Sequence, residues 1–529
     1  LKDLGKLQEA ELSYRKAIEL NPSFAEVHSN LGSILKDLGK LQDAELSYRK
    51  AIELNPSFAE AHSNLGGILK DLGKLQDAEL SYRKAIELKP DYSNAHYNLG
   101  IILNDLSKLQ EAEVSTRKAI QLKPDFADAH NNLGAILTDI GRLQEAEISL
   151  CKAIQLNPNL AESYLNLGSV LSELGNLKGA EISLRKAIQL NPNLAESYYA
   201  LSRINCSDED KTWQDLIFSE NILFKKSKKE QVIIYFTRAN ILHKEKNYKE
   251  SSKCLKLANK LKLAITPSNI DYLIDKSKAL LIESNKKSIN KKVYKNYCES
   301  IFIVGIPRSG STLVESILSM SNDVYDLGEI NFLEESYKEY EKSKEDLNLA
   351  EIYLKKVNPK KNVKITTNKN LYNYQYTGII ASQIPNAKII HCVRNPLDNI
   401  LSIYRANFKK GNEYSSSLVD CARIYLDQEK VMTKYKNKFP SKIYDLKYDQ
   451  LVTNPNQEIK SLIKWLGWEW DDSYLSPHLN TRSVSTASNI QVRSPINSRS
   501  IGGWKNYKEM LRPAIAIITQ NDKYKNFVL

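Results

Sequence analysis

A short glycine-containing loop in the second half of the chain has the residue types and spacing of a phosphate-binding site. The apolar run 301–304 predicts a buried strand, the sequence GIPRSGST follows it, and a helical pattern begins at Leu313. Backbone amides and the dipole of the new helix would point at an anion there, and hydroxyl groups would add donors. We therefore predict a phosphate cradle formed by Arg308, Ser309, Gly310, Ser311 and Thr312.

The same loop argues against a nucleotide kinase. Gly305, Gly310 and Thr312 fit the kinase pattern G-x-x-x-x-G-K-[ST], but Ser311 stands where that pattern requires lysine. The cation of this loop is Arg308, which lies inside it. A small-molecule kinase that transfers the γ-phosphate of ATP is therefore disfavoured, whereas binding of a 5′-phosphate is not.

The loop resembles the 5′-phosphosulfate loop of sulfotransferases, in particular the P-R-S-G-[ST]-T form of the tyrosylprotein sulfotransferases. These enzymes use 3′-phosphoadenosine 5′-phosphosulfate (PAPS). The resemblance implies a second phosphate site, made by an arginine at a strand end and a serine eight residues later. In KIIHCVRNPLDNILSIYR (388–405), Arg394 ends a predicted strand and Ser402 follows at that distance. The resemblance therefore implies that Arg394 and Ser402 bind the 3′-phosphate.

The resemblance also implies a catalytic base and a catalytic cation. The family's Gly-Glu pair corresponds to Gly328-Glu329, and Glu329 would take the proton of the acceptor hydroxyl. Its Asn-Lys pair corresponds to Asn368-Lys369, and Lys369 would neutralise charge on the sulfuryl and bridging oxygens, together with Arg308. We expect no metal in this chemistry.

Other positions follow from the same resemblance, which covers residues 298–510. Tyr448 would lie near the adenine, and the segment STASNIQVRSPI resembles the family's loop over the cofactor, with Ser485 and Arg493 in contact with it. His391 and His478 are alternative bases; the position of His391 on the strand before Arg394 favours a packed core histidine instead.

The first half of the chain is a repeat. Six copies of a 34-residue sequence fill residues 1–204, and the first copy begins inside a helix, so we expect a truncated N-terminus. A proline stops each helix pair, and apolar positions recur at helical spacing. The pattern predicts paired antiparallel helices stacked into a solenoid, and it resembles the tetratricopeptide repeat (TPR). The register is marked by Pro22, Pro56, Pro90, Pro124, Pro158 and Pro192.

One polar position of this repeat could bind a peptide on the concave face of the solenoid. Carboxamides hydrogen-bond a peptide backbone without reading its sequence. The alternative is that asparagine is simply frequent at this position of a TPR. The residues concerned are Asn30, Asn64, Asn98, Asn132 and Asn166. Histidines also recur, at 28, 62, 96 and 130, but they fall on separate helices, so the repeat explains them better than a metal site does.

Charge and composition narrow the choice of partner. Residues 1–204 carry 23 basic and 27 acidic side chains, whereas the remaining residues carry 52 basic and 36 acidic ones. A basic second half indicates an anionic partner, and without any nucleic-acid motif we expect an anionic nucleotide rather than nucleic acid. The chain has no apolar run of about 20 residues and no C-x-x-C pair, so we expect no membrane span and a cytoplasmic enzyme.

These observations predict three segments. Residues 1–204 form a TPR solenoid, 205–295 a degenerate TPR-like helical cap and linker, and 296–529 an α/β sulfotransferase domain with a mainly parallel sheet. The predicted function is transfer of a sulfuryl group from PAPS to an acceptor hydroxyl, foremost a protein or peptide tyrosine. The alternatives are a carbohydrate or small-molecule acceptor with the TPR array as an assembly module, and a non-catalytic TPR scaffold.

Overall fold

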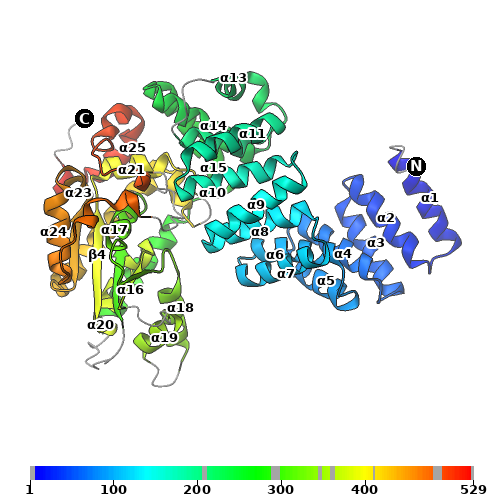
Figure 1. Ribbon diagram of the computed structural model, residues 1–529, viewed down its shortest axis with the longest axis horizontal. Coiled ribbons are helices and arrows are strands. Elements are labelled where there is room, and N and C mark those ends of the chain that lie inside the picture. Colours follow the sequence, from blue (N-terminus) through cyan, green and yellow to red (C-terminus); the bar gives the residue numbers. More distant parts are fainter. Residues whose placement is uncertain are drawn as a thin grey trace. The chain divides into compact units, whose positions relative to one another are not determined.

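The computed structural model describes residues 6–204, 211–286, 298–343, 348–357, 364–408, 411–480 and 491–525. The chain divides into two compact units, Leu1–Pro192 and Asn193–Leu529. The first is all-helical and the second contains a five-stranded sheet. Figure 1 shows helices in the blue and cyan part of the chain and labels strand β4 (Ala387–Val393) in the yellow part. The predicted fold class, a TPR solenoid followed by an α/β domain with a parallel sheet, is confirmed.

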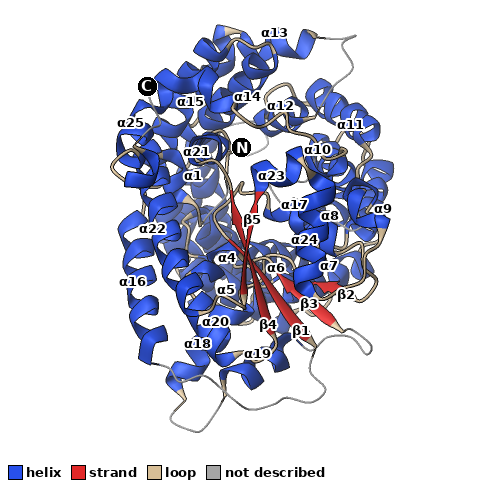
Figure 2. Cartoon of the chain, turned by 90° about the vertical axis from the view of Figure 1, so that its left-hand side faces the viewer, coloured by secondary structure: helices blue, strands red, loops and turns tan. Residues whose placement is uncertain are grey.

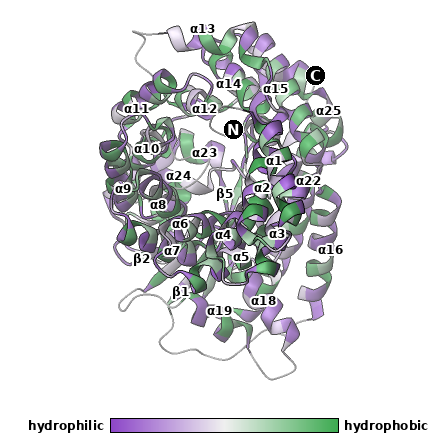
Figure 3. Ribbon diagram, turned by 90° about the vertical axis from the view of Figure 1, so that its right-hand side faces the viewer, coloured by the Kyte–Doolittle hydropathy of each residue, from purple (hydrophilic) through white to green (hydrophobic). Residues whose placement is uncertain are grey.

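The first unit consists of helices that begin at intervals of the repeat. The first helix of each repeat starts at Ala25, Ala59, Ser93, Ala127 or Ala161. The second helix starts 16 residues later, at Leu41, Leu75, Leu109, Leu143 or Leu177. Hydrophilic and hydrophobic residues alternate around these helices (Figure 3), so each helix buries one side. The helices are α1 (Leu7–Leu20), α2 (Ala25–Asp37), α3 (Leu41–Leu54), α4 (Ala59–Asp71), α5 (Leu75–Leu88), α6 (Ser93–Asp105), α7 (Leu109–Leu122), α8 (Ala127–Ile140), α9 (Leu143–Leu156), α10 (Ala161–Leu174) and α11 (Leu177–Leu190).

Close approach between helices of a pair depends on glycine. A Cβ atom at Gly66 on α4 would lie 2.9 Å from the ring of Tyr82 on α5. Tyr82 is itself 2% exposed, so its ring has little freedom to move away. The N-L-G element of the repeat is therefore a packing requirement, set by the aromatic residue on the next helix.

The repeat sequence continues past the point where the packing divides the chain. Helix α12 (Ala195–Arg203) has the register of a sixth repeat, yet it belongs to the second unit. It packs against α14 (Lys228–Lys244), where Asn240 Nδ2 donates to Ser202 Oγ at 3.1 Å and Lys244 Nζ donates to the Ile204 carbonyl.

The sheet of the second unit is parallel throughout, with strand order β2-β3-β1-β4-β5. Its residues alternate between two clusters of apolar side chains: Phe302 packs toward α19, α20 and α22, whereas Ile303 packs toward α17 and α24. Figure 2 shows helices on both faces of the sheet. The strands are β1 (Glu299–Val304), β2 (Val324–Asp326), β3 (Ile365–Asn368), β4 (Ala387–Val393) and β5 (Ile443–Lys447).

Helices surround this sheet. The α-helices are α13 (Thr212–Phe218), α14 (Lys228–Lys244), α15 (Tyr248–Ile265), α16 (Ile270–Lys286), α17 (Ser311–Leu318), α18 (Phe332–Lys342), α19 (Leu349–Val357), α20 (Thr377–Gln383), α21 (Pro396–Tyr404), α22 (Leu418–Lys438), α23 (Tyr448–Thr453), α24 (Pro455–Leu466) and α25 (Lys508–Ile518). The 3₁₀ turns are η1 (Glu220–Leu223), η2 (Leu371–Tyr374), η3 (Glu413–Ser416), η4 (Asp472–Leu475), η5 (Pro477–Leu479), η6 (Gln491–Arg493), η7 (Gly503–Tyr507) and η8 (Asp522–Tyr524).

The TPR-like pair α14 and α15 shares a core with the α/β domain. Phe236 on α14 and Leu255 on α15 are buried in one cluster with Leu397 on α21 and Leu511 on α25. Asn259 Nδ2 also donates to the Tyr404 carbonyl at 3.0 Å, and this contact is buried. This helical pair is thus part of the compact unit that contains the sheet.

The contact between Gly66 and Tyr82 gives a prediction about stability. Gly66→Ala forces the Cβ against a packed ring, whereas the atom nearest to a Cβ at the neighbouring Gly67 would be the Tyr82 hydroxyl oxygen, at 3.5 Å. We expect Gly66→Ala to be less stable than Gly67→Ala by about 1–3 kcal/mol, as measured by urea unfolding followed by circular dichroism. Equal stability of the two variants would contradict the assignment of Gly66 as a packing position.

Candidate active site

A residue that we predict to bind the nucleotide or take part in catalysis follows the carboxyl end of every strand of the sheet. In the order of the sheet, Glu329 follows β2, Lys369 follows β3, the loop with Arg308 follows β1, Arg394 follows β4 and Tyr448 follows β5. Because all five strands are parallel, these residues meet at one edge, which is where open α/β sheets bind ligands. Neighbouring strands lie about 4.8 Å apart, so the edge from β2 to β5 spans roughly 19 Å.

The loop after β1 has a backbone that only certain residues tolerate. Gly310 has φ +96° and precedes the first turn of α17, and a Cβ there would lie 2.3 Å from the ring of Tyr448. Arg308 is one of the few non-glycine residues in the left-handed region, with φ +69°. Strained backbone of this kind is maintained by surrounding contacts and concentrates at functional sites.

Contacts of Arg308 connect the loop to the second predicted phosphate site. Its Nε donates to Ser402 Oγ at 3.0 Å and its Nη2 donates to Gln491 Oε1 at 2.8 Å. Its carbonyl accepts from Arg394 Nη1 at 3.0 Å. The structure therefore brings Arg308, Ser402 and Arg394 together, although Ser402 and Arg394 lie more than 80 residues from the loop in sequence.

Positive charge accumulates at this place. Burial, and after it the charges of Arg394, Arg203 and Arg405, together lower the pKa of Arg308 to about 10. Arg308 is still a cation at neutral pH. Several guanidinium groups that repel one another form a site that a multiply charged anion would stabilise.

Arg394 lies between an aromatic ring and a loop from near the C-terminus. Its guanidinium lies 4.6 Å from the ring centroid of Tyr448, and its Nη2 donates to the Ser500 carbonyl at 3.0 Å. The Tyr448 hydroxyl in turn lies 2.9 Å from Ser500 Oγ. Asp398 on α21 accepts from the backbone amides of Gly502 and Trp504 and so fixes the segment that carries Ser500.

Two buried polar atoms test whether this site fits a phosphate-bearing ligand. Among the described residues, neither Ser309 Oγ nor Arg394 Nε has a hydrogen-bond partner, although Ser309 is 1% and Arg394 8% exposed. A buried donor without a partner is costly. Phosphate oxygens are suitable acceptors for both, so the residues at this edge fit a phosphate-bearing ligand.

A second cluster lies on the other side of the loop, at the ends of β2 and β3. Lys369 Nζ is 2.8 Å from Glu329 Oε1 and 3.3 Å from Glu315 Oε2. The Lys369 side chain is 1% exposed and that of Glu329 is 53% exposed. Burial by itself would lower the pKa of Lys369, but the two carboxylates outweigh burial and raise it, so the side chain is an ammonium group.

Backbone contacts fix the two members of this cluster relative to each other. The amide of Lys369 donates to the Gly328 carbonyl at 2.8 Å, which extends the pairing of β2 with β3 by one step. The Asn370 side chain donates to the Ile330 carbonyl and to Asn331 Oδ1. The pair of Lys369 and Glu329 is therefore a product of strand pairing.

Not every residue of the predicted cofactor loop is located. Ser485 lies outside the described residues. Arg493 Nη1 donates to the Asn480 carbonyl, while Gln491, two residues earlier, makes the contact with Arg308. His391, an alternative base, is 3% exposed, lies 2.7 Å from Asp445 Oδ1 and has its pKa lowered by burial, as expected of a core histidine.

Sequence reasoning missed two residues that contact the predicted site. Gln491 was part of the segment compared with the family's loop, and its contact with Arg308 depends on folding that the sequence does not display. Glu315 had a signal that could have been used. It is the only charged residue of the sequence STLVESIL in α17, and a charge in an apolar helix calls for a buried partner.

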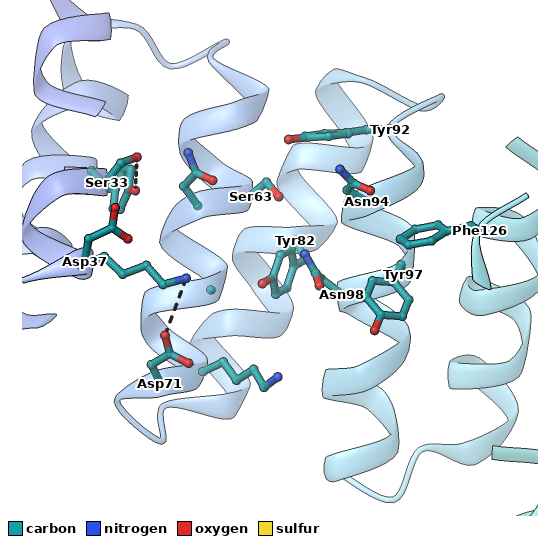
Figure 4. Close-up of a pocket in the computed structure, with 15 residues that line it drawn as sticks. Ser33, Asp37, Ser63, Asp71, Tyr82, Tyr92, Asn94, Tyr97, Asn98 and Phe126 are labelled. Atoms are coloured by element: carbon teal, nitrogen blue, oxygen red, sulfur yellow. Dashed lines mark hydrogen bonds and ion pairs between the residues drawn. The ribbon is translucent and has the colours of Figure 1, made fainter. Parts of the chain in front are cut away.

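The asparagine positions of the solenoid differ in their surroundings. Asn64 and Asn98 line a groove of about 520 Å³, together with lysines, aspartates and aromatic rings (Figure 4). Asn30 is exposed, whereas Asn132 Nδ2 donates to Thr116 Oγ1 and Asn166 Nδ2 donates to Asn131 Oδ1. Of the five asparagines, Asn64 and Asn98 are therefore the ones that line this groove.

The recurring histidines serve the repeat. The Nε2 atoms lie 3.0–3.1 Å from the carbonyl oxygen of the proline six residues earlier, which ties the start of each repeat to its first helix. The residues concerned are His28, His62, His96 and His130.

Comparison with protein families assigns the two halves of the chain. Residues 300–356 and 342–472 match the model of the sulfotransferase family. Residues 1–39, 32–73 and 66–107 match a TPR repeat model, and residues 93–126, 127–160, 161–194 and 232–264 match a tetratricopeptide repeat model. The protein therefore combines a TPR array with a sulfotransferase-family domain.

Individual relatives resemble parts of the chain. An uncharacterized protein of Aquifex aeolicus is 32% identical over 252 residues, which is 42% of this chain and 32% of that protein, so the match spans about a third of the relative's length. The crystal structure of YrrB, described as a TPR protein with an unusual peptide-binding site, is 26% identical, with a TM-score of 0.31 over 35% of this chain and 96% of that one. Pseudomonas aeruginosa PilF is 23% identical, with a TM-score of 0.35 over 39% and 95%.

Hydropathy gives one further finding. Within the described parts of the chain, no helix is both long enough and apolar enough to cross a membrane.

The backbone of the loop predicts the effect of one substitution. Gly310→Ala would place a Cβ 2.3 Å from the Tyr448 ring in a strained conformation, so we expect loss of detectable binding of 3′-phosphoadenosine 5′-phosphate in a calorimetric titration. Gly467→Ala is the control, because Gly467 has a similar positive φ of +73° in open space after α24. Binding retained in Gly310→Ala would contradict a ligand site at this loop.

Proposed function

We propose that this protein transfers a sulfuryl group from PAPS to the hydroxyl group of a tyrosine in a protein or peptide. The observation that carries the proposal is the arrangement at one sheet edge: an ammonium–carboxylate pair lies on two strands, and an arginine-lined phosphate cradle lies on the next two. The first cluster has the groups for proton removal and charge neutralisation. The second has the groups for binding a nucleotide with two phosphate positions.

The nucleotide would be bound by groups that already converge. The loop Arg308–Thr312 and the N-terminus of α17 would hold the 5′-phosphate, and Arg394 with Ser402 would hold the 3′-phosphate. Tyr448 follows β5 beside Arg394 and offers a ring for the adenine side. We retain Ser485 and Arg493 as proposed contacts of the loop over the nucleotide.

The chemistry assigned to the chain's residues is a single displacement at sulfur. PAPS, when bound, supplies an activated sulfuryl group. Glu329 accepts the proton of the acceptor hydroxyl while the oxygen–sulfur bond forms and the bond from sulfur to the departing phosphate oxygen breaks. Lys369 and Arg308 neutralise the charge that accumulates on the departing oxygen. The exposed position of Glu329 allows an acceptor to approach it from solvent.

The acceptor class is proposed from the solenoid. The groove lined by Asn64 and Asn98 offers carboxamides, and Tyr92 and Tyr97 line the same groove (Figure 4). Such groups suit an extended polypeptide better than a small molecule. We propose that the array binds a protein substrate and raises the local concentration of its tyrosine at the catalytic edge.

The nucleotide assignment predicts a selective binding isotherm. We expect 3′-phosphoadenosine 5′-phosphate to bind more tightly than ATP or ADP, and Arg394→Ala to weaken that binding by about 10- to 100-fold, because a charged hydrogen bond to phosphate is lost. Calorimetric titration measures both effects. Arg512→Ala, which removes an exposed arginine on α25, is the control and should bind as the wild type does. Tighter binding of ATP, or binding of no nucleotide, would refute the proposal.

The role of the base predicts a loss of turnover without a loss of nucleotide binding. We expect Glu329→Gln to lower kcat by about 10²- to 10⁴-fold and to leave the affinity for 3′-phosphoadenosine 5′-phosphate within a few-fold. Turnover is measured by mass spectrometry of tyrosine peptides, with serine peptides and sugars as competing acceptors. Glu335→Gln, which changes an exposed carboxylate on α18, is the matched control. Unchanged kcat would remove Glu329 from this role, and sulfated sugar without sulfated peptide would overturn the tyrosine assignment.

A further inference from the structure

A buried carboxylate lies beside Lys369, in addition to the exposed Glu329. Glu315 is in the second turn of α17, the helix that begins at the phosphate loop, and its side chain is 3% exposed. Its Oε2 lies 3.3 Å from Lys369 Nζ. Lys369 thus pairs with two carboxylates from different elements, one buried and one exposed.

Removal of the Glu315 carboxylate from water costs free energy that its surroundings must offset. A buried ionised group is tolerated when an opposite charge compensates it, and removal of one partner leaves the other uncompensated. One carboxylate would be enough to neutralise Lys369. The presence of two gives the group of three a net negative charge.

The proposed reaction changes this charge balance. When Glu329 accepts the acceptor's proton, its carboxylate becomes neutral and no longer compensates Lys369. With Glu329 as the sole counter-ion, a buried ammonium would then be left unpaired at the moment when its charge is required. Glu315, whose side chain is 3% exposed, is not the group that takes the proton, so its contact with Lys369 is still present after Glu329 has become neutral.

Other titratable groups near this cluster do not take over that task. Cys392 on β4 lies within the electrostatic reach of Lys369, and burial raises the pKa of its thiol to about 12. Tyr372 in η2 lies within the reach of Glu329, and burial raises its pKa as well. Both groups stay neutral near pH 7, so Glu315 and Glu329 are the carboxylates that the structure places within ion-pair distance of Lys369.

We propose that Glu315 is a positioning residue that keeps Lys369 charged and in place while Glu329 takes the proton. This inference rests on the proposed function, since it assigns Glu315 a part in that reaction. It also connects the phosphate loop with the catalytic lysine, because Glu315 and the loop are joined through the rigid first turns of α17.

Two substitutions separate the charge of Glu315 from its place in the packing. Glu315→Gln keeps the shape and removes the charge, and Glu315→Asp keeps the charge and shortens the reach. Lys369 has to be a cation, so activity falls as the pH rises through its pKa, and a raised pKa extends activity to higher pH. Loss of the Glu315 charge lowers that pKa, and the alkaline limb of the kcat profile moves to lower pH by about one unit or more.

The experiment is a set of pH profiles of kcat for the full chain with PAPS and a tyrosine peptide. We expect the alkaline limb of Glu315→Gln to shift to lower pH. For Glu315→Asp we expect the limb of the wild type with kcat at least fivefold lower, because Lys369 is charged but displaced. Glu334→Gln, which removes the ion pairs of Glu334 with Lys276 and Lys338, is the control and should keep the wild-type profile.

Each outcome decides a different question. An active wild type with the same limb in Glu315→Gln overturns the role of Glu315 and leaves the proposed function standing. If Glu315→Gln does not fold, Glu315→Asp carries the test, and an unchanged kcat in that variant overturns the role. A wild type that neither binds 3′-phosphoadenosine 5′-phosphate nor transfers sulfuryl groups overturns the proposed function and this inference with it.

Discussion

The parallel direction of all five strands is the constraint on which the candidate site depends. Side chains that follow β1 to β5 are far apart in the sequence, and only a common strand direction brings them to one edge. The order of the strands then sorts them, with the carboxylate and the lysine at β2 and β3 and the arginines at β1 and β4. An antiparallel strand in the middle would send its following residue to the opposite end of the sheet.

Two parts of that edge differ in charge. Arg308, Arg394 and Arg405 repel one another at one part of the edge, and the carboxylates of Glu315 and Glu329 surround Lys369 at the other. One region therefore attracts an anion, while in the other the lysine is already paired with carboxylates of the protein. A ligand that spans both regions would have its phosphates at the first and its reacting group at the second.

Periodicity and local motifs made much of this architecture predictable. The 34-residue repeat predicted the helix pairs, and an apolar run before GIPRSGST predicted β1 and the loop. The sequence could not show that β2 pairs with β3, which places Glu329 beside Lys369, because strand pairing depends on packing between distant segments. Nor could it show that α12 packs with α14 although its sequence continues the repeat. Both are tertiary contacts with no local signature, whereas the inward position of Glu315 had one, because Glu315 is the only charged residue in the apolar sequence of α17.

The repeats of the solenoid are nearly interchangeable, and this has a consequence for how such a protein changes over generations. Helices α3 and α5 have the same sequence, LQDAELSYRKAIEL, and α2 and α4 differ at two positions. Stretches of a gene that encode such copies recombine out of register, which adds or deletes whole units. The second compact unit, which carries the candidate site, contains its own TPR-like pair, α14 and α15, within its core. The number of repeats, and with it the length of the solenoid, can therefore differ among descendant proteins, while the residues of the candidate site stay the same.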